Sequence, residues 1–125
     1  MADELKLGVS IEYQKGNTEL LSFLVSGRKR SVSGNPLTGM QVVSVGTSEE
    51  TIPLGETTAA GALMFGENLD DVNYVELRDA TGASNDVVRV GPREPFLFRW
   101  GSDVTTPYWI ANTAAVLMRY GLIPL

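Results

Sequence analysis

The chain has 125 residues, which is enough for one domain with a substantial core, and its 43% hydrophobic residues exclude a disordered protein. It contains no cysteine and no histidine, which excludes disulfides, thiolate metal sites and the side chain that most often acts as a general base. The net charge of −5 argues against a general nucleic-acid binder, so we expect no direct contact with nucleic acid.

Nothing in the sequence suggests a membrane protein. No apolar run approaches the roughly 18 residues that would span a bilayer. The first four residues, Met1 to Glu4, end in two acids and lead straight into an alternating pattern, which is not typical of a signal peptide. We therefore expect no membrane partner, and synthesis in the cytoplasm.

The first part of the chain is predicted to form strands. Residues 5–13 are apolar at every second position, the pattern of a half-buried strand, and residues 15–18 have the composition of a hairpin loop. The returning strand, 19–26, has leucines on both faces, so we expect it to be covered on both sides. Gly27 is expected to end it, and residues 28–33 to form a short polar edge strand.

The rest of the chain repeats short apolar runs and turn formers. Strands are predicted at 40–46, 51–54, 62–66, 73–79, 86–90, 96–100, 108–112 and 114–120. The last of these has a helical composition, but its alternation and the closing Gly121 favour a strand. About ten short strands predict an all-β, antiparallel, jelly-roll-like sandwich: a single domain of residues 1–125 with arms at 1–4 and 122–125.

Residues 62–78 are two apolar runs around a polar corner, and the corner concentrates oxygen ligands. Glu67, Asp70 and Asp71 lie there with Asn68 and Asn73. Calcium takes six to eight oxygens, but the spacing does not fit an EF-hand, and Asn and Asp are common in plain turns. We expect no metal site.

Catalytic patterns are weak throughout. Residues 34–39 have the glycine spacing of a phosphate-binding loop, but Met40 and Gln41 replace the lysine and the hydroxyl residue that such a loop needs. Glu76 and Asp79 are three residues apart in a predicted strand, so they point to opposite faces and do not converge as a carboxylate pair. We expect no catalytic residue, no cofactor and no enzymatic activity.

The aromatic residues are the next candidates for a binding surface. The three aromatics in residues 96–100 alternate with other residues, which favours core packing over a sugar-stacking platform. Trp109 lies opposite Tyr108 and Ile110 in its strand. If those two are core, Trp109 is exposed, and it is then the best single candidate for an interface anchor.

Charge and the C-terminal tail suggest further interface residues. Three basic residues, Arg28, Lys29 and Arg30, stand together, whereas residues 31–77 contain seven acids and no base. These could be complementary faces between copies, but solvated loops are the more ordinary explanation of the acids. The apolar tail residues Leu122, Ile123 and Leu125 are expected to pack on their own domain or on a neighbour.

Several segments resemble a family of small virion structural proteins of tailed bacteriophages. The resemblance is carried by residues 43–50, 68–70, 73–77, 96–99 and 111–117, which form a pattern of strands and corners rather than a catalytic signature. It implies a β-sandwich subunit that assembles in many copies on a phage particle, with no site residues to carry over.

The leading hypothesis is therefore a capsid decoration (cement) protein on the outer surface of a virion. It would bind the major capsid protein or other virion proteins, and it would form dimers or trimers. One alternative is a structural protein of the neck, tail or fibre base. A second alternative, of a different class, is a carbohydrate-binding module that uses exposed aromatics.

Overall fold

A computed structural model describes residues 4–34, 36 and 39–125, apart from the side chain of Leu20. The described chain is all-β and antiparallel, as predicted, with strands in three sheets and one short 3-10 turn at Ala83–Asn85. It forms two compact units, Met1–Val32 and Ser33–Leu125, instead of the single domain that was predicted. The first three residues of the expected N-terminal arm lie outside the described residues.

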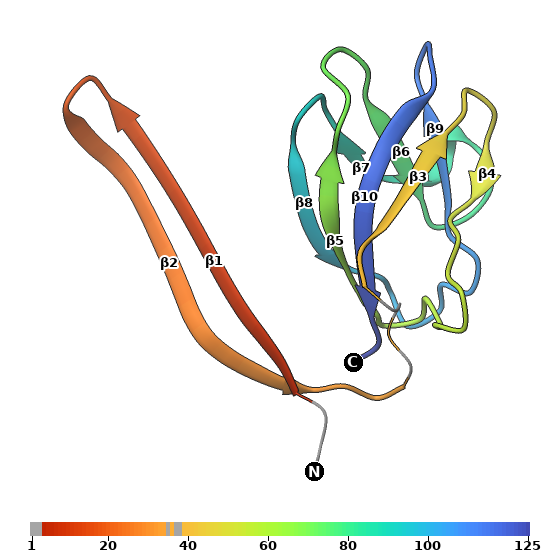
Figure 1. Ribbon diagram of the computed structural model, residues 1–125, viewed down its shortest axis with the longest axis horizontal. Helices are drawn as coiled ribbons and strands as arrows, with labels where there is room; N and C mark the ends of the chain where they lie inside the picture. Colours follow the sequence, from red (N-terminus) through yellow and green to blue (C-terminus); the bar gives the residue numbers. More distant parts are fainter. Residues whose placement is uncertain (1–3, 35, 37–38) are drawn as a thin grey trace. The chain divides into compact units, whose positions relative to one another are not determined.

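The first unit is one long hairpin, which we call the arm (Figure 1). Strand β1 (Glu4–Lys15) pairs with β2 (Thr18–Ser31). The prediction that Gly27 ends the second strand is wrong. Gly27 has a φ of 69° and lies in a β-bulge, where the register passes from Leu7–Arg28 to Val9–Val25, so the strand continues through it.

The second unit is a sandwich-like arrangement of two four-stranded sheets (Figure 1). The first sheet has the order β3 (Gln41–Val45), β10 (Val116–Ile123), β5 (Leu63–Asn68) and β8 (Pro95–Arg99). The second sheet has the order β4 (Glu50–Thr51), β9 (Tyr108–Ala111), β6 (Val75–Arg78) and β7 (Asp86–Val90). The finer expectation of a jelly-roll topology stays a prediction.

The core lies between these two sheets and follows from period-two alternation. On β10, Met118, Tyr120 and Leu122 are buried in the core, while Arg119 is exposed on the opposite face and Gly121 is covered there by Phe65, so the C-terminal stretch is a strand and not a helix. From the second sheet, Leu77 and Trp109 face them. The Trp109 and Tyr120 rings meet edge to face, 5.2 Å apart, and this contact joins the two sheets.

The polar corner of residues 62–78 carries the chain from one sheet to the other. Strands β5 and β6 do not pair with each other, because β5 lies in the first sheet and β6 in the second. The buried Asn68 holds the corner: its amide nitrogen donates to the carbonyl oxygens of Asn73 (2.8 Å) and Val90 (3.2 Å). Its side-chain oxygen accepts a hydrogen bond from the backbone of Asp70. A buried amide satisfied in this way fixes the path of the turn.

Candidate interaction surfaces

One face of the arm is apolar along most of its length. In an antiparallel pair, residues directly opposite each other share a face, so the register assembles this surface pair by pair. We define the apolar arm face as Leu5, Leu7, Val9, Ile11, Tyr13, Leu21, Phe23 and Val25. Its outer half is open to solvent: the exposed fractions are 58% for Ile11, 55% for Phe23 and 66% for Leu21.

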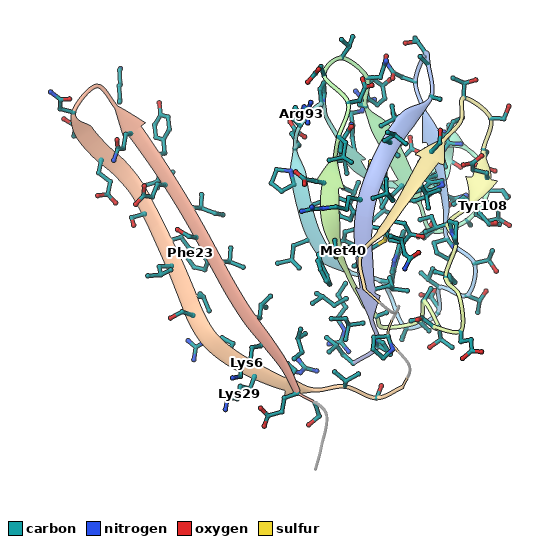
Figure 2. All side chains as sticks on the ribbon, in the orientation of Figure 1. Lys6, Phe23, Lys29, Met40, Arg93 and Tyr108 are labelled. Carbon is teal, nitrogen blue, oxygen red and sulfur yellow. The ribbon has the colours of Figure 1, made fainter. Side chains whose placement is uncertain are left out.

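The predicted basic cluster lies at the end of the arm away from its turn. Arg28 and Arg30 are opposite Leu7 and Leu5, so they extend the apolar arm face, whereas Lys29 is opposite Lys6 on the other face. Figure 2 shows the two lysines together at that end. Like charges directly opposite each other are unfavourable. Lys29 has one exposed carboxylate nearby, Glu4 at 3.7 Å, and within the described residues Arg28 and Arg30 form no ion pair.

The first sheet also carries apolar side chains on its solvent face. We call this surface the Phe65 face and define it as Met40, Val42, Phe65, Leu97 and Leu117. A Cβ atom at Gly121 would lie only 2.7 Å from the Phe65 ring and 3.1 Å from the Met40 sulfur, so both side chains lie over this glycine. An ion pair between Arg119 and Glu67 (3.1 Å) crosses the same face.

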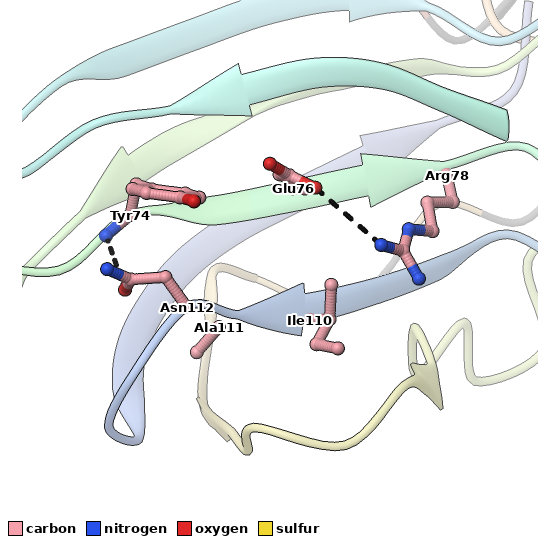
Figure 3. A pocket seen from close by; sticks show the side chains of 6 residues that line it. All are labelled: Tyr74, Glu76, Arg78, Ile110, Ala111 and Asn112. Atoms are coloured by element: carbon pink, nitrogen blue, oxygen red, sulfur yellow. Dashed lines mark hydrogen bonds and ion pairs between the residues drawn. The ribbon is translucent and has the colours of Figure 1, made fainter. Parts of the chain in front are cut away.

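The second sheet has a different solvent face, which is charged and internally paired (Figure 3). Arg78 is largely buried and donates to Asp86 (2.5 Å) and Glu49 (2.7 Å), and it lies 3.6 Å from Glu76. Arg89 donates to Glu76 and stacks over the Tyr74 ring at 4.1 Å. These contacts join strands β6 and β7 to the loop that precedes β4.

A shallow pocket of about 140 Å³ lies on this charged face, lined by Tyr74, Glu76, Arg78, Ile110, Ala111 and Asn112. Its polar groups already have partners in the protein, since the Tyr74 backbone donates to Asn112 and Glu76 binds both arginines. Ligand pockets usually hold about 300–1,000 Å³ and bury most of the ligand. The pocket is therefore too small and open to define a ligand site.

The ion pairs around Arg78 shift the pKa values of their members. The hydrogen bond from Arg78 is the main reason why the pKa of Glu49 lies below its ordinary 4.5, and the Glu49 and Asp86 carboxylates raise the pKa of Arg78. Burial alone would raise the pKa of Asp86, but the hydrogen bond from Arg78 helps to outweigh it, so the pKa lies below 3.8. Backbone donors at Asn73 and Val72 likewise lower the pKa of Asp70.

These carboxylates predict an acid-sensitive fold. Because their pKa values are lower in the folded than in the unfolded chain, their contribution is complete above pH 4.5 and is lost as the pH falls through the folded values. We expect the urea midpoint to be nearly constant between neutral pH and about pH 5 and to fall steadily below about pH 4.5. Urea titrations at a series of pH values measure this.

The variant Arg78→Met identifies the source of the effect. It should lower the midpoint at neutral pH and flatten the fall in acid, because Glu49 and Asp86 then lose the donor that lowers their pKa values. Arg119→Met is the control, since Arg119 pairs with Glu67 on an exposed surface and should leave the acid profile unchanged. An unchanged profile in Arg78→Met would contradict the assignment.

The oxygen-rich corner that was weighed as a calcium site uses its oxygens within the protein. One Asp70 oxygen accepts from the backbone nitrogens of Val72 and Asn73, and Asp71 pairs with Arg93 at 2.6 Å. In the part of the chain that the structure describes, no three acidic side chains gather as a metal would require. The Asx-type hydrogen bonds explain why Asn and Asp occur here.

The expectation that Trp109 is exposed is wrong. Its side chain is fully buried, while Tyr108 and Ile110 are half-buried on the outer face of β9. Its register partner on β6 is the buried Leu77, and because opposite residues share a face, Trp109 points into the core with it. Trp109 is therefore a core residue and cannot anchor an interface or stack on a sugar.

The C-terminal tail packs on its own domain. Leu122 is buried in the core as part of β10, so it is not available to a partner, while Ile123 and Leu125 are half-buried. The carbonyl of Pro124 accepts a hydrogen bond from the Ser33 backbone at 3.1 Å. Residues 122 and 123 complete a strand, so the expected arm at 122–125 does not exist as a separate segment.

The Phe65 face was not predicted from the sequence. Its members come from four separate segments, and each looks like an ordinary strand residue in its own stretch. The one available signal is the alternation on 114–120, which puts Leu117 on the face opposite the buried Met118.

No family model, curated protein or solved structure matches the chain. Among the described residues, no helix is long and apolar enough to cross a membrane.

Proposed function

We propose that this chain is a structural subunit of a tailed-phage virion, a decoration protein that binds the lattice of the major capsid protein and stabilises the head. The observation that carries the proposal is the arm, a separate two-stranded unit with a solvent-exposed apolar face. A lone hairpin is at best marginally stable in water, so a surface of this kind calls for a protein partner. The resemblance of residues 43–117 to virion structural proteins suggests that this partner belongs to a phage particle.

The arrangement suits attachment to other protein surfaces better than chemistry on a small molecule. The apolar arm face and the Phe65 face are extended apolar surfaces, and surfaces of this type bind other proteins, further copies of the same chain included. The charged face of the second sheet is internally paired through Arg78 and Arg89 and so would stay in solvent. Binding to the assembled shell alone would stabilise that shell by mass action, by about 2.7 kcal/mol per site at a hundredfold excess over Kd.

The proposal is tested by adding the purified full chain to expanded phage heads that lack decoration protein. Saturable binding is expected, with on the order of hundreds of copies per particle, together with a higher temperature of head disruption. The same chain carrying Phe23→Asp should bind at least about tenfold more weakly, because a charge then replaces an apolar contact. The control is Val72→Asp, which changes an exposed valine in a loop of the second unit.

The stoichiometry also separates the proposal from its alternative. About a dozen copies or fewer per particle would assign the chain to the neck, tail or fibre base instead. No binding to heads at any concentration would contradict the decoration role. The carbohydrate-binding alternative loses its main support, because Trp100 and Trp109 are buried.

A further inference from the structure

The arm has an apolar surface that nothing in its own two strands can cover. Three or more strands, or packing against another element, are needed before such a ribbon is stable in water. The pairs Ile11–Phe23 and Tyr13–Leu21 lie on one side of it, and all four side chains are at least half exposed. The arm therefore needs a second layer, which would pack about 10 Å away as one sheet does on another.

The chain itself presents a surface of matching chemistry. Within the described residues, six large apolar side chains are strongly exposed outside the arm, and four of them belong to the Phe65 face: Met40, Val42, Leu97 and Leu117. The second sheet instead presents the ion pairs of Arg78 and Arg89. Packing an apolar ribbon on the Phe65 face would cost the least desolvation free energy, because Arg119–Glu67 is the one ion pair described on that face.

Charge points to the same pairing. Residues 1–32 contain five basic and four acidic residues, a net charge of +1, whereas residues 33–125 contain five basic and eleven acidic residues, a net charge of −6. Arg28 and Arg30 lie at one end of the apolar arm face. One end of the Phe65 face, where β5 ends and β8 begins, carries four acids and two arginines, a net charge of −2: Glu67, Asp70, Asp71 and Glu94, with Arg119 paired to Glu67 and Arg93 paired to Asp71. The charged ends of the two surfaces thus have net charges of opposite sign.

The available area favours a closed exchange between two copies. The apolar arm face runs from Leu5 to Tyr13, about 30 Å of strand, and a two-stranded ribbon with its side chains is about 10 Å wide, so one arm covers about 300 Å². Stable interfaces bury about 600–1,000 Å² per partner. One arm on one sheet falls short of this, but two copies that each give an arm and receive one reach it with two-fold symmetry.

We infer that the apolar arm face of one copy packs on the Phe65 face of a second copy, and that the exchange is reciprocal. This deepens the proposed function, on which it rests for bringing many copies together. Arg28 and Arg30 then meet the acidic end of the receiving sheet, while the opposite face of the arm, with the exposed Leu24, is left for the capsid lattice.

Oligomeric state gives the first test. The full chain should sediment as a dimer at micromolar concentration, and Phe23→Ser and Leu97→Ser should each weaken self-association at least about tenfold, since they change the two sides of one contact. Val87→Ser is the matched control, because Val87 is 49% exposed on β7 of the second sheet and should leave the dimer intact. Circular dichroism shows that each variant is folded. A monomeric parent chain would overturn the inference, whatever the head-binding experiment gives.

Cysteine pairing identifies the partner surface, since the chain has no cysteine of its own. A chain with Ile11→Cys mixed with a chain with Leu97→Cys should give a disulfide-linked heterodimer on mild oxidation, and neither chain should cross-link well by itself. A homodimer of Ile11→Cys chains would mean that arms pair with arms. An intramolecular cross-link in the double variant would mean that each arm covers its own sheet. Either of these results overturns the exchange between copies.

Discussion

Replacing Trp109 with alanine is expected to lower the free energy of unfolding by about 3–5 kcal/mol, the usual cost of deleting a buried large aromatic. The side chain is fully buried between the sheets and packs edge to face on Tyr120, whose hydroxyl donates to the Pro53 carbonyl at 2.6 Å. Removing it leaves a cavity where the two sheets meet and frees the Tyr120 ring. Urea unfolding followed by circular dichroism measures the loss.

Trp109→Phe is the matched control. The indole nitrogen of Trp109 is buried and has no hydrogen-bond partner among the described residues, so phenylalanine keeps most of the packing and removes a donor that gains nothing. We expect a cost of about 1 kcal/mol, well below that of alanine. A Trp109→Ala variant as stable as the parent chain would show that the side chain does not hold the sheets together.

Replacing Gly66 with alanine should also be strongly destabilising, at the upper end of or above the roughly 1–3 kcal/mol usual for overpacking. Gly66 lies in β5 between β10 and β8, opposite Tyr120 and Phe96. A Cβ atom there would overlap the carbonyl oxygen of Arg119 and lie 2.8 Å from the Tyr120 Cα. Backbone atoms of a paired strand cannot rotate away, so β5 and β10 would have to separate.

The control for this variant is Gly46→Ala, the same change in the same domain. A Cβ atom at Gly46 would meet only a carboxylate oxygen of Glu50 at an ordinary 3.6 Å, so we expect a change of less than about 0.5 kcal/mol. Thermal unfolding of both variants beside the parent chain makes the comparison. Equal midpoints for Gly66→Ala and Gly46→Ala would contradict the steric argument.

Alternation predicted the strands well because it records only which face of each strand is buried. It identified the C-terminal stretch as a strand despite its helical composition, and β10 runs through it to Ile123. It failed at Trp109, where both faces of the strand carry large apolar residues. Which of its faces is buried depends on pairing with Leu77 on another strand, and a single stretch of sequence does not contain that information.

The arm was missed for a related reason. Its strands show the cleanest alternation in the chain, and in a single domain that pattern predicts burial in the common core. Alternation indicates that a face will be covered, but not which polypeptide covers it. Gly27 was misread because a glycine that ends a strand and one that forms a bulge look the same in sequence, and only the partner strand distinguishes them.

The left-handed conformation at Gly27 also decides where the guanidinium groups of the arm point. The bulge sets two residues of β2 against one of β1, so that Arg28 follows Val25 on the same side. If Gly27 adopted an extended conformation and the bulge disappeared, the register beyond Val9–Val25 would shift by one residue, and Arg28 would lie opposite Lys6. Both arginines would then cross to the opposite side of the ribbon and Lys29 would take their place. The positive φ of Gly27 thus determines which face of the hairpin carries the two arginines. A residue that disfavours positive φ at this position is expected to move the arginines to the other face, although the number of charges stays the same.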